Sequence, residues 1–182
     1  MWRRFVLPGF LGGLVMSIWG VVINGLLGFK ARIDMKPIPD EPRVYAVLKE
    51  SIVEPGRYAC NPALTDGGAF PGGEPAFSIL YGGVGHEAAG WLLLVQLPLF
   101  FALPTLAAGM LSRAGDRVLS SYPRKAAFFA AIGLLVGASS HLMSFGIGGY
   151  PIDSALALAL HDAAAWTVAG LVMAWRIRPP TA

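Results

Sequence analysis

Long apolar runs, separated by polar segments, dominate the pattern of this chain. Each run reaches the ~20 residues that an α-helix needs to cross the hydrocarbon core of a bilayer. The runs predict transmembrane helices at residues 5–29, 88–111, 126–146 and 152–175. We therefore expect an all-α integral membrane protein, a four-helix bundle in which residues 112–125 connect the second helix to the third.

The segment at residues 30–87 is too long for a simple connection and has a pattern of its own. Asp40-Glu41-Pro42 is typical of a helix start, and Pro55-Gly56 is typical of a helix end. Between them, four apolar side chains follow helical spacing: Val44, Val47, Leu48 and Ile52. Residues 57–60 and 76–81 are strand candidates. We expect a small α+β cap between the first two helices, too small to build a core of its own.

Basic residues are concentrated in the segments that flank the apolar runs. They precede the first run, fill residues 112–125 and follow the last run: Arg3, Arg4, Arg113, Arg117, Arg124, Lys125, Arg176 and Arg178. Only Asp116 opposes them, whereas residues 30–87 hold more acidic than basic side chains. Because basic residues favour the cytoplasmic side, both termini are predicted inside and residues 30–87 outside. The net charge of +3 is then a topology signal, and nucleic acid is not expected as a partner.

Small residues and prolines inside the runs suggest how the helices pack. Gly9 with Gly13, and Gly133 with Gly137, have the spacing that lets two helix backbones approach closely. We expect these pairs to pack within the bundle rather than between copies. Pro98 and Pro104 should bend the second helix. The aromatic residues near the predicted interfaces, Trp19 among them, are expected to form the usual interfacial belt.

Cys60 is the one cysteine of the chain, so an internal disulfide is excluded. A free thiol in an external segment could be reactive. A packed, inert side chain is the favoured expectation.

Polar side chains inside the runs are the candidate functional residues, since ionisable groups are costly in lipid. They gather in the outer halves of the runs and at the mouth of the second: Asn24, His86, Glu87, Gln96, Ser140, His141, His161 and Asp162. Ser139 and Ser144 also flank His141. The inner halves hold almost nothing polar, which argues against a continuous path for a transported solute.

Three interpretations of this polar layer compete. His141 and His161 lie at similar depth on consecutive antiparallel helices, so they could supply both axial ligands of haem b. Asp162 with either histidine could instead relay protons or hydrogen-bond a quinone, with His86 and Glu87 at the entrance. In the favoured interpretation, these side chains hydrogen-bond between helices or hold a partner subunit.

A complete catalytic set is missing from the pattern. There is no nucleophile elbow, and a zinc site would need His86, Glu87, His141 and Asp162 to converge under a folded-down cap. The sequence favours a non-catalytic accessory subunit in or beside a larger membrane complex, for example an energy-transducing one. No cofactor is expected in that role, and the partners are lipids and other membrane subunits. The alternative is a haem- or quinone-binding electron-transfer protein, and a weaker one is a small transporter or lipid-interacting protein.

Three short stretches carry a resemblance to a known group. They lie in the first helix, the cap and the last helix: Gly12-Gly13 with Trp19-Gly20; Glu54-Pro55-Gly56 with Tyr58; and Gly149-Tyr150-Pro151 with Asp162, Trp166 and Ala169-Gly170-Leu171. The chain resembles a loosely defined group of uncharacterised bacterial inner-membrane proteins with four helices and one long external loop. The resemblance implies a bacterial inner membrane with residues 30–87 in the periplasm, and no activity. Asp162 matches the pattern of the group, and the three histidines do not.

Overall fold

A computed structural model describes residues 4–143 and 151–179, without the side chains of residues 86–93. The chain is mostly helical, with a small two-stranded sheet. Within the described ranges, four helices are long and apolar enough to cross a membrane. They lie at Val6–Leu26, Leu94–Leu111, Tyr122–Leu142 and Ile152–Arg176. The predicted number of long apolar helices is thus confirmed.

Two of these long helices change from α to π geometry at one end. The elements are α1 (Val6–Trp19) continued by η2 (Gly20–Leu26), α4 (Gly85–Leu111), α6 (Tyr122–Gly137) continued by η3 (Ala138–Leu142), and α8 (Ile152–Arg176). The first helix ends before residue 29, and the third begins before residue 126. π-Helical turns are rare in proteins. Where they occur, they often lie at functional sites. The sequence pattern did not indicate them.

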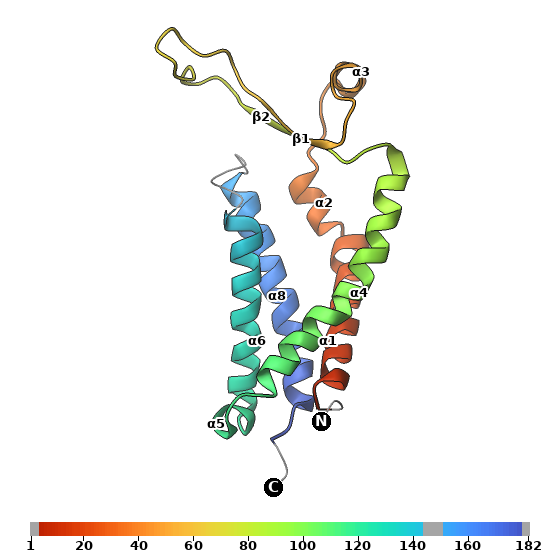
Figure 1. The fold of residues 1–182 in the computed structure, drawn as a ribbon, viewed down its shortest axis with the longest axis vertical. Helices are drawn as coiled ribbons and strands as arrows, with labels where there is room; N and C mark the ends of the chain where they lie inside the picture. The colour runs from red at the N-terminus through yellow and green to blue at the C-terminus, as the bar shows by residue number, and fades with distance from the viewer. Residues whose placement is uncertain (1–3, 144–150, 180–182) are drawn as a thin grey trace.

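The long helices form two closely packed pairs, α1 with α4 and α6 with α8, and α1 also packs on α8. Figure 1 shows the start of α1 and the end of α8 at one end, here called the terminal end, and the helices diverging toward the opposite cap end. The short helix α5 (Asp116–Leu119) lies at the terminal end. A buried core joins the helices: Met16, Ala107, Ala108, Leu111, Leu119, Phe129, Trp166, Ala169, Met173, Ala174 and Ile177.

Glycines allow the close approach of both pairs. A Cβ atom at Gly13 would lie 2.6 Å from the Phe100 carbonyl oxygen of α4. One at Gly133 would lie 2.7 Å from the Trp166 Cβ of α8. Gly9 and Gly137 face the same two helices. The expectation that these glycine pairs pack within the bundle is confirmed.

The terminal end is tied by side chains that the sequence placed in cytoplasmic segments. Lys125 is buried, and its Nζ donates a hydrogen bond of 2.6 Å to the carbonyl oxygen of Ile177. Arg4 donates to the carbonyl oxygen of Arg178 at 3.2 Å. Both bonds satisfy carbonyl groups that directly follow the last residue of α8, Arg176.

Helix α4 continues through Pro98 and Pro104 without a break. Figure 1 shows that it changes direction along its length, as expected for a proline-containing helix. Residues 94–100 are all exposed, whereas Pro104, Ala108 and Leu111 are buried. Residues 94–100 of α4 therefore pack against little of the described chain.

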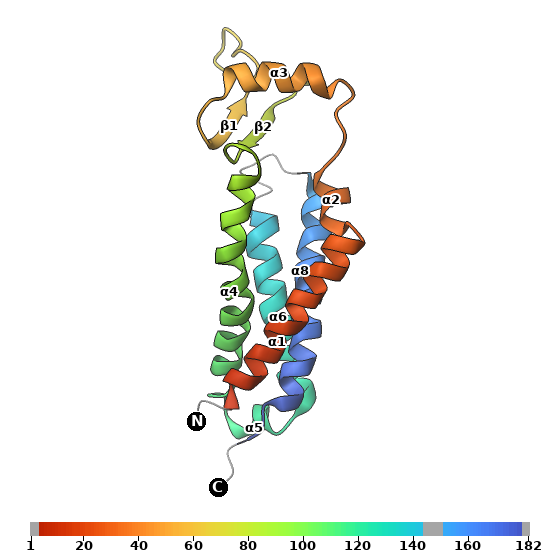
Figure 2. The ribbon, with the colours of Figure 1, turned by 90° about the vertical axis from the view of Figure 1, so that its right-hand side faces the viewer.

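The cap consists of α3 (Glu41–Ser51) and an antiparallel pair of strands, β1 (Gly56–Cys60) and β2 (Phe77–Tyr81), with Tyr58 opposite Ile79. These elements confirm the predicted helix and hairpin, and Figure 2 shows them beyond the ends of the long helices. None of residues 30–85 is buried, so the cap has no core of its own.

Val44, Leu48 and Ile52 are half-buried, and Val47 is exposed. The expectation that Cys60 is packed is wrong. Cys60, the last residue of β1, is exposed.

Candidate functional site

Asp162 is the centre of a polar cluster near the cap end of the long helices. Its Oδ2 accepts a hydrogen bond of 2.9 Å from His141 Nε2, and its Oδ1 accepts one of 2.9 Å from His161 Nδ1. His141 comes from η3, and the other two residues are neighbours on α8. The structure therefore brings His141 and His161, the two histidines that the sequence places inside apolar runs, to the same carboxylate.

The contacts of His161 define its tautomer. Trp19 Nε1, which can only donate, gives a hydrogen bond of 3.0 Å to His161 Nε2. Nε2 is therefore the acceptor, and the ring proton lies on Nδ1, which donates to Asp162. In this arrangement His161 is neutral and has both ring nitrogens engaged. This hydrogen bond gives Trp19 a contact that the expected interfacial belt did not include.

Two further partners come from α2 (Phe29–Asp34), immediately after the first long helix. Lys30 Nζ lies 3.5 Å from Asp162 Oδ1, and the Phe29 ring stacks on His161 with centroids 5.1 Å apart. Gly28 makes this return possible, because its φ of 62° lies in the left-handed region that favours glycine. The lysine charge balances the carboxylate, which lowers the cost of burying it.

Sequence reasoning found His141, His161 and Asp162 but missed Trp19, Phe29 and Lys30. Lys30 was counted only as one charge of the external segment. A signal was present, since Gly28 marks the end of the apolar run and is followed at once by an aromatic and a basic residue. A turn at that glycine directs both side chains back toward the helices.

The remaining residues predicted for the site either lie around the cluster or fall outside the part of the chain that the structure describes. Asn24, in η2, and Gln96, in α4, border a cavity beside it. Ser140 lies in η3 next to His141. His86 and Glu87 are in the first turn of α4, but their side chains, like the whole of Ser144, lie outside the described residues. Within the described part, no three His, Cys, Asp or Glu side chains gather as metal ligands would.

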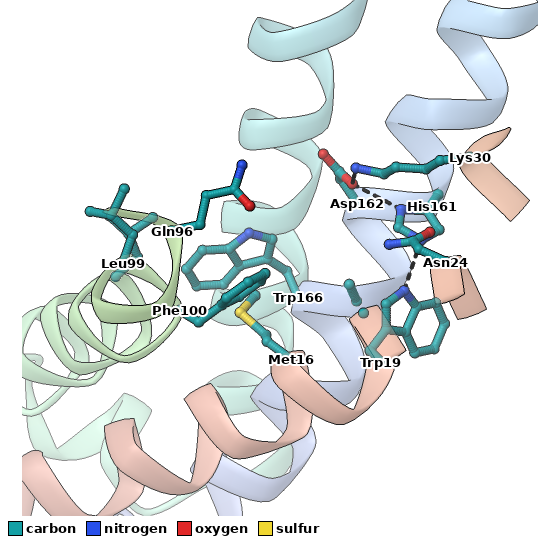
Figure 3. Close-up of a pocket in the computed structure, with 13 residues that line it drawn as sticks. Met16, Trp19, Asn24, Lys30, Gln96, Leu99, Phe100, His161, Asp162 and Trp166 are labelled. Carbon is teal, nitrogen blue, oxygen red and sulfur yellow. Dashed lines mark hydrogen bonds and ion pairs between the residues drawn. The ribbon is translucent and has the colours of Figure 1, made fainter. Parts of the chain in front are cut away.

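A cavity of about 270 Å³ lies between α1 with η2, α2, α4 and α8. Figure 3 shows its polar side, where Asn24, Lys30, His161 and Asp162 lie close together. The other walls are apolar or aromatic: Met16, Trp19, Gly20, Leu99, Phe100, Leu103, Ala165 and Trp166. Asn24 Oδ1 is buried and has no hydrogen-bond partner among the described residues.

This geometry bears on the haem hypothesis. Axial ligation needs a free nitrogen on each imidazole. One carboxylate, that of Asp162, bridges His141 and His161, and Trp19 occupies the remaining nitrogen of His161. Ligation of haem by His161 would require one of these hydrogen bonds to break.

Comparison with family models, with curated proteins and with solved structures gives no match to this chain. The resemblance to four-helix bacterial membrane proteins therefore stays an expectation.

Proposed function

We propose that this chain is a non-catalytic accessory subunit of the bacterial inner membrane, which binds another membrane protein through its cap and the adjoining half of α4. The four long apolar helices support a membrane location. The basic residues at the terminal end support cytoplasmic termini and a periplasmic cap.

Exposed apolar side chains that run from β2 into α4 carry this proposal. They are Leu80, Val84, Leu94 and Leu97, which are 80%, 78%, 74% and 59% exposed, and together they are called the cap–α4 surface. In a periplasmic cap, Leu80 and Val84 would stand in water rather than in lipid. Exposed apolar groups of this kind mark interaction surfaces. A partner that covered them would also supply the packing that the cap lacks.

The polar cluster supports a structural role rather than chemistry. Both ring nitrogens of His161 and both oxygens of Asp162 are engaged within the cluster. The contacts join η3, α8, α1 and α2. Polar side chains that hydrogen-bond to one another across helices hold those helices in register.

Site-specific photo-crosslinking tests the partner surface. A photoreactive amino acid replaces Leu80 or Leu97, and the matched control replaces Leu135 on α6, which is 70% exposed. We expect a discrete protein adduct in intact cells at the first two positions and only lipid adducts at Leu135. Adducts of equal yield at all three positions, or lipid adducts alone, would contradict the proposal.

An electron-transfer protein is the second candidate, and the cavity beside His161 is the observation that favours it. Its haem version has a direct test. A Soret band in the spectrum of the purified protein, lost in both His141→Ala and His161→Ala, would support it and would count against the accessory role. A spectrum without that band removes the haem version.

A further inference from the structure

Six arginines lie at the terminal end of the molecule, around the ends of the four long helices. All six are exposed, and they are here called the terminal arginines: Arg4, Arg113, Arg117, Arg124, Arg176 and Arg178. Asp116 is the one acidic residue among residues 4–5, 112–125 and 176–179. The cap differs, because residues 30–85 hold six basic and seven acidic side chains. Positive charge is therefore concentrated at one end of the molecule.

The contacts of these arginines leave their charge uncompensated. Arg124 donates to the carbonyl oxygen of Arg117 at 2.7 Å, and the bonds of Arg4 and Arg113 also end on backbone carbonyl groups. These acceptors are neutral, and a guanidinium group has five N–H donors. In the described part of the chain, every ion pair involves Asp162 at the cap end. None of these pairs joins a terminal arginine to a carboxylate.

Lys125 adds a buried charge behind the terminal arginines. It is 7% exposed, and its Nζ donates at 2.6 Å to the carbonyl oxygen of Ile177, another neutral acceptor. A buried charge is costly unless it is paired, and no carboxylate among the described residues pairs with this one. Negative charge at the adjoining surface would lower that cost, because electrostatic attraction is stronger where water is excluded.

The terminal arginines lie where an apolar surface ends. Arg176 is the last residue of α8, and Leu171 and Trp175 of the same helix are exposed. The Arg176 Cζ lies 5.3 Å from the centroid of the Trp175 ring. Tryptophan is typical of the membrane interface, where apolar surface gives way to charged headgroups. A phospholipid covers both parts of this surface, with acyl chains on Leu171 and a phosphate beside Arg176, whereas an acidic protein segment would meet only the arginines.

From this charge distribution we propose that the terminal end binds anionic phospholipid, with the phosphate of a headgroup such as phosphatidylglycerol paired to the terminal arginines. Guanidinium groups bind phosphate oxygens through two parallel N–H bonds. A zwitterionic headgroup offers the same phosphate but also carries a cation, which the neighbouring arginines repel. The proposal requires the helices to span a bilayer and needs no partner protein, so it is independent of the accessory role.

Electron paramagnetic resonance of spin-labelled lipids tests the proposal. The full chain is reconstituted in phosphatidylcholine bilayers with a trace of phosphatidylglycerol or phosphatidylcholine that is labelled near the end of one acyl chain. Lipids in contact with the protein give a motionally restricted component, and its share of the spectrum reports the relative affinity. We expect about fivefold preference for phosphatidylglycerol, the usual effect of one basic residue near an anionic headgroup. Equal shares for the two lipids overturn the proposal.

Two pairs of substitutions remove the same charge from opposite ends of the molecule. Arg124→Gln with Arg176→Gln changes the terminal arginines, and Arg43→Gln with Lys49→Gln changes exposed residues of α3. The first pair should lower the preference for phosphatidylglycerol to less than about twofold, and the second should leave it unchanged. Equal loss in both pairs would mean that net charge alone attracts the lipid, and would reject a site at the terminal end.

Arg124→Lys with Arg176→Lys keeps the test sharp even if the glutamine pair folds poorly. Both charges remain, and only the geometry of the donors changes. This variant should keep most of the preference for phosphatidylglycerol. If it loses the preference as completely as the glutamine pair does, charge is not the cause and the proposal is wrong.

Two soluble anions distinguish other partners. Inorganic phosphate offers charged oxygens without acyl chains, and polyglutamate represents an acidic protein. Each is compared with sodium chloride at equal ionic strength, because salt screens exposed charges. Neither should lower the preference for phosphatidylglycerol beyond the effect of sodium chloride. A larger loss with phosphate would indicate a site for the free anion, and a larger loss with polyglutamate a protein-binding surface. Either result rejects a lipid site.

Discussion

At the scale of single residues, Asp162 holds the cap end of the bundle together. Its carboxylate meets His141 from η3, His161 from α8 and Lys30 from α2. A carboxylate in an apolar environment is costly unless it is paired and hydrogen-bonded. The three partners meet that requirement, so removing the charge affects several segments at once.

Asp162→Asn should lower the free energy of unfolding by about 2 kcal/mol, the usual value of a hydrogen bond to a charged group. The variant keeps the shape of the side chain but leaves Lys30 without its counter-ion. The measurement is equilibrium unfolding of the purified protein in mild detergent. Asp153→Asn, at the exposed start of α8, is the matched control and should stay within about 0.5 kcal/mol of the unmodified chain. Equal stability of the two variants contradicts the role given to Asp162.

The sequence could predict His141, His161 and Asp162 because polar groups stand out in apolar runs. It could not predict Trp19 or Lys30 as their partners. Trp19 looks like any interfacial tryptophan, and its donation to His161 depends on how α1 is rotated against α8. Lys30 returns to Asp162 only because the chain turns at Gly28.

At the scale of elements, the two helix pairs depend on glycines that leave no room for a side chain. Gly133 faces the Trp166 Cβ and the Ala163 carbonyl oxygen, which are fixed parts of α8 rather than the ends of flexible side chains. A glycine in η2, Gly20, has another role, because it borders open space. The spacing of glycines in the sequence does not distinguish a glycine that packs against a helix from one that borders open space.

Gly133→Ala should destabilise the protein by about 1–3 kcal/mol, since the added methyl group overpacks the contact between α6 and α8. Gly20→Ala, the matched control, should be neutral or stabilising by up to about 1 kcal/mol, because alanine favours helices and meets no neighbour there. Unfolding in the same detergent compares the two. A Gly133→Ala variant at least as stable as Gly20→Ala would be inconsistent with this packing.

At the scale of the whole molecule, packing is concentrated at the terminal end. The core residues and the bonds of Lys125 and Arg4 tie that end together, whereas the helices diverge toward a cap without buried residues. The cavity and the cap–α4 surface both follow from this divergence. They lie where the chain leaves its own apolar groups uncovered.

Labelling of the one cysteine tests the orientation in the membrane. Cys60 is exposed in the cap, so a membrane-impermeant maleimide should label it in spheroplasts. The control combines Cys60→Ser with Ser120→Cys, an exposed position at the terminal end, and should react only after permeabilisation. The reverse pattern would place the cap in the cytoplasm and reject the proposed topology.

The sequence by itself determined the long apolar helices, the cap helix and the hairpin. These depend on run length, local periodicity and turn residues, all of which act over a few neighbouring positions. Only the tertiary structure decided which polar groups meet at Asp162, where the π-helical turns fall and where the cavity opens. Those features depend on the rotation, approach and divergence of helices far apart in the chain, which a one-dimensional pattern does not record.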